Sequence, residues 1–392
     1  MSSGFFPSST LHKQRPVGLI PKCGQCGLFK SCQSPKMKRH GEGGRRILFV
    51  GEAPGEKEDE RGRPFVGKAG QFLRGNLRDL GFDLDNDGWV TNACICRPPG
   101  NKMPEPKQVS ACFPNLRRTL LETGPLVVVT LGRTALSSIL TGIWDDIRDM
   151  GRWVGWQIPV GPYWICPTYH PSYLLRSHSP TLDQLFRGHL EAALDIDRAP
   201  EPLEIQSSTV ECLIDDEEAC EAIREIKRTS GWVAVDYETN CIKPEWPKGR
   251  IYSCALSNGK RTISYPWTTY TSEATGQLLR DDCYKIASNL KMEERWTLRT
   301  FGHGVHNWGW DVMLAAHCLD NRPGICSLKF QSLVRLGIKK YNAHIEACFE
   351  SRNGPYNRIH DVKLHDLLHY GGLDAYYEHV LAMLQQKDLG FK

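Results

Sequence analysis

The sequence of 392 residues lacks any apolar run that approaches the roughly 20 residues of a membrane span. Its first 20 residues are punctuated by Ser, Pro, Lys and Arg, and they lack the apolar core of a signal peptide. We therefore expect this segment to be a flexible tail. These absences argue against secretion and membrane insertion, and they predict an intracellular, cytoplasmic protein with no membrane partner.

The composition predicts a globular chain that is long enough for two cores, with 40% apolar and 24% charged residues. Fifteen cysteines in a chain of this length favour free thiols or metal ligands over a disulfide scaffold. The first 200 residues hold 26 Lys and Arg against 19 Asp and Glu, whereas the remainder holds 23 against 26. A basic first half suits a polyanionic partner, and an acidic second half suits bound metal ions or a solvated surface.

Four short apolar runs in the first half predict strands that alternate with helices, which is typical of a parallel sheet covered by helices on both faces. The runs are Ile47–Val50, Trp89–Ala93, Pro125–Gly132 and Trp164–Tyr169. Glu52, Asn92 and His170 follow or end three of these strands, so we expect them to meet at one edge of the sheet. Phe65 should bring an aromatic ring to the same edge. A carboxylate beside an exposed ring suggests a flat substrate, although an ordinary strand-turn-helix remains the alternative.

Cysteines recur at spacings that suit metal ligation. Cys23 and Cys26 lie close enough for one turn to present both thiolates to one metal, and Cys96 and Cys112 offer a second, widely spaced pair. Four thiolates from two segments fit either an iron–sulfur cluster or structural zinc, while scattered buried thiols are the alternative. Cys32 and Cys94 are additional thiols in the same region.

The second half contains three acidic motifs. Asp236 and Glu238 end a predicted strand, where alternation puts both carboxylates on one face, and such a pair favours Mg²⁺ or Mn²⁺. Asn307 and Asp311 are four residues apart, as are Tyr370 and Asp374, and we expect one helical turn at each place. Gly371 and Gly372 interrupt the last helix and predict a loose turn there.

The first half resembles a known family through three motifs. GEAPGEKEDERGRPFVGKAG, TNACICRPPGN and HPSYLLR are similar to those of family 4 uracil-DNA glycosylases, and the likeness runs from about Cys23 to His189. The resemblance implies a 4Fe–4S cluster on Cys23, Cys26, Cys96 and Cys112. A related branch carries a basic insertion with His after the Asn strand, and no such insertion lies between Cys96 and Cys112.

The same resemblance implies a division of roles around an extruded uracil. Phe65 would stack on the base, and Asn92 would read its edge. His170 would stabilise the leaving anion, and Glu52 would position the attacking water. Three further side chains are candidates for contacts to backbone phosphates: Ser172, Arg176 and Lys68.

The three acidic motifs resemble those of the 3′-5′ proofreading domains of DNA polymerase I-type enzymes, the DEDD superfamily with Tyr. This likeness covers about Val210 to the end of the sequence. It implies a ribonuclease H-like fold in which two Mg²⁺ or Mn²⁺ ions bind Asp236, Glu238, Asp311 and Asp374. Tyr370 would then orient the nucleophilic water, and Asn307 would hold the terminal nucleotide.

We therefore predict an α/β protein of two domains: a tail (1–20), a uracil-DNA glycosylase-like domain (21–197), a Pro- and Ser-rich linker (198–209) and a 3′-5′ exonuclease domain (210–392). Its partner would be DNA, both uracil-containing and with single-stranded 3′ ends. One alternative is a proofreading and uracil-sensing subunit of a separately encoded DNA polymerase, because no polymerase region is recognisable. Another is an exonuclease that acts on RNA, because no feature reads the 2′-hydroxyl.

Overall fold

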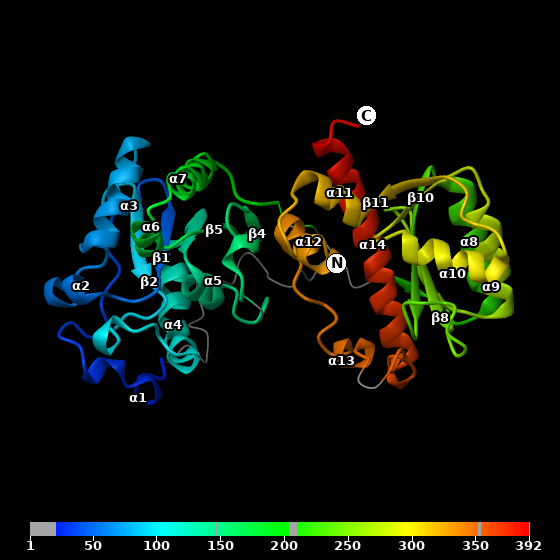
Figure 1. The fold of residues 1–392 in the computed structure, drawn as a ribbon, viewed down its shortest axis with the longest axis horizontal. Coiled ribbons are helices and arrows are strands. Elements are labelled where there is room, and N and C mark those ends of the chain that lie inside the picture. The colour runs from blue at the N-terminus through cyan, green and yellow to red at the C-terminus, as the bar shows by residue number, and fades with distance from the viewer. Residues whose placement is uncertain (1–20, 146, 202, 204–209, 352–353, 392) are drawn as a thin grey trace. The chain divides into compact units, whose positions relative to one another are not determined.

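The computed structural model describes residues 21–145, 147–201, 203, 210–351 and 354–391 (Figure 1). The predicted tail and most of the predicted linker lie outside these residues. The chain divides at Pro200–Glu201 into two compact units, and each is an α/β sheet covered by helices, as predicted. Among the described residues, no helix combines the length and the low polarity that crossing a bilayer requires.

The first unit contains a five-stranded sheet in the order β2-β1-β3-β5-β4. Its strands are β1 (Ile47–Gly51), β2 (Gly88–Asn92), β3 (Val127–Leu131), β4 (Ile158–Val160) and β5 (Tyr163–Thr168). All neighbours are parallel except β4, which runs antiparallel to β5 at the edge. Strands β1 and β3 are apolar and buried along their whole length, as in sheets covered by helices on both faces.

Helices connect the strands of the first unit. They are α1 (Cys23–Cys26), η1 (Leu28–Lys30), α2 (Glu56–Arg61), α3 (Lys68–Asp79), η2 (Pro99–Asn101), α4 (Pro106–Thr123), α5 (Arg133–Ile139), η3 (Met150–Arg152), α6 (Pro171–Ser177) and α7 (Pro180–Leu194). Apolar residues of α3, α6 and α7 pack against β1 and β3 in one core. Four parallel strands thus end at the same edge, and the loops that follow them form one rim.

The second unit contains a six-stranded sheet in the order β11-β10-β7-β8-β9-β6. Its strands are β6 (Glu211–Cys212), β7 (Trp232–Thr239), β8 (Ile251–Ser257), β9 (Thr262–Pro266), β10 (Tyr284–Ala287) and β11 (Trp308–Asp311). Strands β7, β10 and β11 are parallel, whereas β8 runs antiparallel to its neighbours β7 and β9. The carboxyl end of β7 therefore lies beside the amino end of β8.

The helices of the second unit are α8 (Asp216–Thr229), α9 (Thr269–Leu279), α10 (Lys291–Phe301), α11 (Val312–Leu319), α12 (Leu328–Leu336), α13 (Glu346–Phe349), η4 (Ile359–Asp361) and α14 (Leu364–Asp388). Figure 1 shows α8, α9 and α10 on one face of the sheet and α14 on the other. Alternation along β7 supports this division, because Val233, Val235 and Tyr237 join the first core and Ala234 joins the second.

The loose turn predicted at Gly371 and Gly372 does not occur, because α14 continues through both glycines. A Cβ at Gly372 would lie 2.2 Å from Val210 Cγ1, and one at Gly371 would lie 3.2 Å from Glu238 Cγ. The two glycines therefore let α14 approach Val210 and the carboxylates of β7 closely. This close packing offsets their weak helix propensity.

Two candidate active sites and a cysteine centre

The structure brings Glu52, Asn92 and His170 to the same edge of the first sheet. Asn92 ends β2 beside Gly51, the last residue of β1, and Glu52 follows. The hydroxyl of Thr134, in the first turn of α5, donates to Glu52 Oε2 at 2.7 Å. His170 follows β5 and packs against the loop after β3, where a Cβ at Gly132 would lie 3.0 Å from the Cβ of His170.

Gly51 lets the side chains of Phe65 and Asn92 approach the end of β1 closely. A Cβ at Gly51 would lie 2.5 Å from Asn92 Oδ1 and 2.6 Å from Phe65 Cζ, so any side chain there would collide with both. Phe65 is buried, with a left-handed backbone (φ 55°) that only a tightly held residue maintains. Gly70 allows this conformation, because a Cβ there would lie 2.2 Å from the carbonyl oxygen of Phe65.

His170 caps α6 in a way that fixes its tautomer. The backbone N–H of Ser172 donates to His170 Nδ1 at 3.2 Å, and the Ser172 hydroxyl lies 2.7 Å from the same atom. Since Nδ1 accepts a hydrogen bond, the ring proton is on Nε2. Burial, with a smaller contribution from the Arg176 charge, lowers the pKa of His170 to about 4. The imidazole is therefore a neutral donor at physiological pH.

The side chains predicted to bind phosphate take different positions. Ser172 holds His170, as described above, so it acts as a positioning residue in this structure. Arg176 lies exposed on α6, and Lys68 lies exposed at the first residue of α3. Both cations are available to a ligand at the surface of this unit.

Glu58 is a residue that the sequence reasoning missed. Its carboxylate accepts hydrogen bonds from the N–H of Gly55 at 3.1 Å and from the N–H of Gly67 at 2.7 Å. It therefore ties the turn after β1 to the turn that carries Phe65. The Gly-x-x-Glu spacing of a capping box was the available signal.

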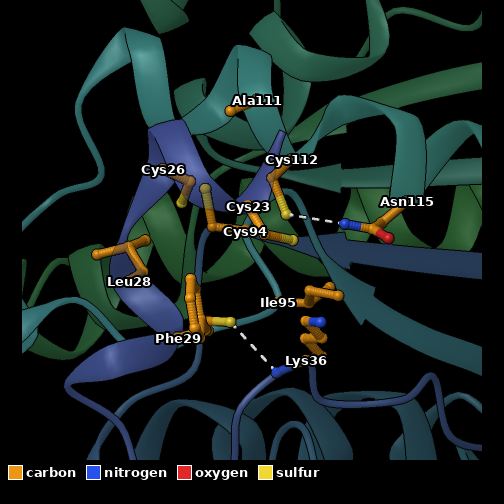
Figure 2. Close-up of a pocket in the computed structure, with 11 residues that line it drawn as sticks. Cys23, Cys26, Leu28, Phe29, Lys36, Cys94, Ile95, Ala111, Cys112 and Asn115 are labelled. Carbon is orange, nitrogen blue, oxygen red and sulfur yellow. Dashed lines mark hydrogen bonds between the residues drawn. The ribbon is translucent and has the colours of Figure 1, made fainter. Parts of the chain in front are cut away.

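A separate cavity is lined by five cysteines, and Figure 2 labels Cys23, Cys26, Cys94 and Cys112 among them. They are Cys23 and Cys26 of α1, Cys94 and Cys96 after β2, and Cys112 of α4. The rest of the lining is mainly apolar and includes Leu28, Phe29 and Ile95. All cysteines among the described residues are free thiols. The expected ligand set is therefore gathered at one place, with Cys94 beside it.

Hydrogen bonds distinguish among these thiols. The backbone N–H of Lys36 donates to Cys96 Sγ at 3.2 Å, and the Asn115 amide donates to Cys112 Sγ at 3.5 Å. Cys94 donates to Cys112, which lowers the pKa of the Cys112 thiol and raises that of Cys94. N–H donors to sulfur are typical of iron–sulfur sites, so the donor set fits such a cluster. Cys32 hydrogen-bonds to Cys96 but does not line the cavity.

The second unit holds a carboxylate cluster, defined as Asp236 and Glu238 of β7 with Asp374 of α14. One oxygen of each carboxylate lies within 4.8 Å of the others. Burial, reinforced by the charge of Asp374, raises the pKa of Asp236 to about 7, and burial also raises that of Glu238. Three carboxylates at this separation repel one another unless cations neutralise them, so the group fits divalent metal ions.

Lys329, Tyr341 and Tyr370 surround Asp374. The ammonium group of Lys329 contacts both carboxylate oxygens of Asp374 and lies 4.5 Å from the centre of the Tyr370 ring. The hydroxyl of Tyr341 donates to the same carboxylate. Tyr370 thus stands at the cluster as expected, whereas Lys329 and Tyr341 lie in stretches that gave no signal in the sequence.

The expected positions of Asn307 and Asp311 require correction. Residues 308–311 form strand β11 and not a helical turn, so the two side chains stand at opposite ends of a strand about 13 Å long. The Asn307 amide donates to the carbonyl of Asp282. The Asp311 carboxylate accepts from four backbone N–H groups, those of 289, 290, 313 and 314. Asp311 is thus the N-cap of α11 and does not join the cluster.

Glu293 lies where a fourth carboxylate was expected. It is in the first turn of α10, 4% exposed, and its Oε2 atom has no hydrogen-bond partner among the described residues. Burial and the charge of Asp236 raise its pKa. Asn289, at the carboxyl end of β10, precedes it by four residues, so Asn289-Leu-Lys-Met-Glu293 has the Asn-x3-acid spacing that we assigned to Asn307 and Asp311. This motif was not identified in the sequence because its acidic residue is Glu293 and not the expected Asp.

Comparisons with known proteins match a different family to each of the two units. Residues 39–193 match the uracil DNA glycosylase superfamily, and residues 209–387 match a 3′-5′ exonuclease family. The type-4 uracil-DNA glycosylase of Thermotoga maritima is 39% identical over 177 residues, which are 44% of this chain and 88% of that protein.

The chain also shows a similarity to one longer protein and to one solved structure. A DNA polymerase of Bacillus phage SP01 is 26% identical over 324 residues, which are 74% of this chain and 34% of that polymerase. The structure of Escherichia coli RNase D has 14% identity and a TM-score of 0.35, and it covers 46% of each chain. This chain thus spans about half the length of that nuclease. The chain belongs to the uracil-DNA glycosylase superfamily, next to its type-4 members, and it is a hydrolase whose second half is a 3′-5′ exonuclease domain.

Proposed function

We propose that the protein excises uracil from DNA with its first domain and removes nucleotides from 3′ ends with its second. The observation that carries the first activity is the convergence of Phe65 and Asn92 on Gly51, directly beside Glu52. A base inside a duplex cannot reach this rim, so the uracil must leave the stack first.

The side chains of the rim have complementary tasks on an extruded uracil. The ring of Phe65 stacks on the base. The Asn92 amide offers both a donor and an acceptor, which suits the O4 and N3–H edge of uracil. Cytosine would leave these groups unpaired, at a cost on the order of 1–3 kcal/mol for each.

Bond cleavage places negative charge on uracil O2 and positive charge on the sugar. The neutral His170 donates a hydrogen bond from Nε2–H to the developing anion on O2. Glu52 positions the water, and the Thr134 hydroxyl holds Oε2 so that the other carboxylate oxygen faces the reactants. Arg176 and Lys68 supply charge for backbone phosphates.

The cysteine cavity holds a 4Fe–4S cluster in this proposal, with Cys23, Cys26, Cys96 and Cys112 as its ligands. The support is the lining of the cavity, together with the N–H donors to Cys96 and Cys112. The cluster would join the chain before β1 to the loop after Asn92. Its part is structural, because none of these cysteines stands at the strand tips.

The second domain hydrolyses phosphodiester bonds at 3′ ends. Two Mg²⁺ or Mn²⁺ ions would bind Asp236, Glu238 and Asp374, with Glu293 as the fourth carboxylate, and would activate water and stabilise the leaving oxygen. Tyr370 orients the attacking water from beside Asp374. The comparisons give no support to a separate polymerase subunit, and we do not propose one.

The two activities are separable in one preparation. Uracil release from a labelled oligonucleotide should proceed in EDTA, whereas strand shortening should require Mg²⁺ or Mn²⁺. A double variant, Glu52→Ala with His170→Ala, should lose uracil release and keep strand shortening, and Asp236→Asn should do the opposite. Uracil release that survives the double variant would refute the catalytic assignment. Matched DNA and RNA strands would show which polymer the second domain takes.

A further inference from the structure

A second cavity of about 340 Å³ lies in the exonuclease domain and has no part in the site described above. We call it the tryptophan pocket. Its lining includes Trp246, Trp267 and Trp296, with Arg250 and Arg299 at the surface. A volume of this size is typical of pockets for small organic groups.

The aromatic side chains of the tryptophan pocket are held rigidly. Trp267 packs edge-on against Tyr237, with ring centres 5.4 Å apart, and Trp246 does so against Tyr356 at 5.9 Å. Gly249 passes directly under Trp296, since a Cβ there would lie 3.1 Å from the tip of the indole. Flat faces that are fixed in place suit the stacking of a planar ring.

The polar groups of the tryptophan pocket lack partners within the protein. The indole N–H of Trp296 is buried without an acceptor, and Trp296 is only 3% exposed. Arg250 and Arg299 form no ion pair among the described residues, whereas Arg295 on the same helix binds Glu245. A buried donor without a partner is costly, and free guanidinium groups attract anions. The partner missing at the surface is therefore an anion, which would lie beside an aromatic ring.

The tryptophan pocket is connected to the carboxylate cluster by two short stretches of chain. Its loop begins at Asn240, two residues or about 7 Å along the strand from Glu238. The Asn240 amide anchors that loop by donating to the carbonyl of Lys248 and accepting from the N–H of Arg250, both at 2.8 Å. Trp296 follows Glu293 by three residues, or about 5 Å along α10. The pocket lies on the face of β7 that carries Tyr237, opposite the face that carries Asp236 and Glu238. A bound strand would therefore pass from the cluster to the pocket around the carboxyl end of β7.

We propose that the tryptophan pocket binds one base and its adjoining phosphate in the single strand whose 3′ end lies at the carboxylate cluster. The base stacks on an indole, and the phosphate binds Arg250 and Arg299. This site rests on the proposed exonuclease function, which it extends by an internal nucleotide of the substrate. Stacking of this kind is sequence-tolerant, so the pocket accepts any base.

The test measures binding in EDTA, so that no strand is cut. Fluorescein-labelled (dT)₃ and (dT)₁₀ are titrated with the full chain, and anisotropy gives the dissociation constants. Trp296→Phe replaces the indole with a smaller ring that has no N–H, and Arg299→Gln removes one charge. Each variant should weaken binding of (dT)₁₀, about tenfold for the pair together, and should leave (dT)₃ unchanged because it reaches only the cluster. Arg224→Gln, an exposed position on α8, is the charge-matched control and should bind both strands normally.

Three outcomes would each contradict either the proposed nucleotide site or the proposed exonuclease function. Unchanged (dT)₁₀ affinity in the double variant, with a normal melting temperature, would refute nucleotide binding by the pocket. This holds even if the wild type shortens strands in Mg²⁺. A wild type that binds (dT)₁₀ through the pocket but never shortens it would overturn the exonuclease function instead. Displacement of (dT)₁₀ by dTMP at equal concentration, lost in Trp296→Phe, would make the occupant the free nucleotide and would also overturn the proposal.

Discussion

The ammonium group of Lys329 contacts both carboxylate oxygens of Asp374, the residue that α14 contributes to the carboxylate cluster. The pair is largely buried, with the Lys329 side chain 17% and the Asp374 side chain 7% exposed. A tethered cation therefore occupies the side of Asp374 that a metal ion would need. Removal of one partner from such a buried pair leaves an uncompensated charge.

Lys329→Met should separate these effects. Without metal, we expect a lower melting temperature, because the carboxylates lose their counter-charge. With metal, we expect about tenfold tighter Mn²⁺ binding by calorimetry, because no ammonium group has to be displaced. Lys340→Met, which removes a more exposed pair with Glu346, should change neither quantity measurably. Wild-type Mn²⁺ affinity in Lys329→Met would contradict this role.

Glu293→Gln and Asp311→Asn should fail in different ways. Glu293→Gln should lower exonuclease activity by about 100-fold or more while the melting temperature stays level or rises, since it removes the charge of a buried carboxylate with one unpaired oxygen. Asp311→Asn should lower the melting temperature, because its carboxylate accepts four backbone N–H bonds, and it should leave metal affinity intact. The reverse pattern would restore Asp311 as the fourth ligand.

Gly51→Ala should abolish uracil release, because its methyl group would collide with Asn92 and Phe65 and displace both side chains. We expect a loss of about 100-fold or more, with exonuclease activity retained on the same chain. Gly75→Ala is the matched control, since a Cβ in the middle of α3 meets nothing within 4 Å. It should stabilise the protein by up to about 1 kcal/mol. Normal uracil release by Gly51→Ala would place the base elsewhere.

The protonation of His170 should occur near pH 4 and not near its ordinary value, because burial opposes the charged ring. The unfolded chain binds a proton on this residue below about pH 6.5 while the folded chain does not, so the free energy of unfolding should fall as the pH drops from about 6.5 to 4. NMR titration of the imidazole tests this directly. Arg176→Gln should move the midpoint upward, and a wild-type midpoint near 6.5 would refute the neutral donor.

An absorbance spectrum tests whether the cysteine cavity holds an iron–sulfur cluster. Cys96→Ser should abolish absorbance near 400 nm in aerobically purified protein, since Cys96 lines the cavity and accepts an N–H bond. Cys32→Ser should keep the absorbance, because Cys32 lies outside the lining. Equal loss in both variants would show that the ligand set differs. Zinc and no iron by elemental analysis would replace the cluster altogether.

The sequence predicts the two folds and the edge of the first sheet well, because polar residues that directly follow apolar strands must share a rim. It does not predict Glu58, whose importance depends on two turns meeting in space. The assignment of Asn307 and Asp311 failed because spacing by four residues does not distinguish a helical turn from a strand. Lys329 and Tyr341 could not be found either, since helix α12 and the segment after it reach Asp374 only through the packing of α14.

The contact between Val210 and Gly372 determines where the chain can be cut to separate its two domains. A polypeptide that starts at residue 211 would expose bare helix backbone where the valine belongs, and it should express as a weakened nuclease. Cleavage a few positions earlier keeps the Val210 side chain packed against Gly372. Proteolytic fragments cut ahead of Val210 should therefore yield a self-sufficient nuclease.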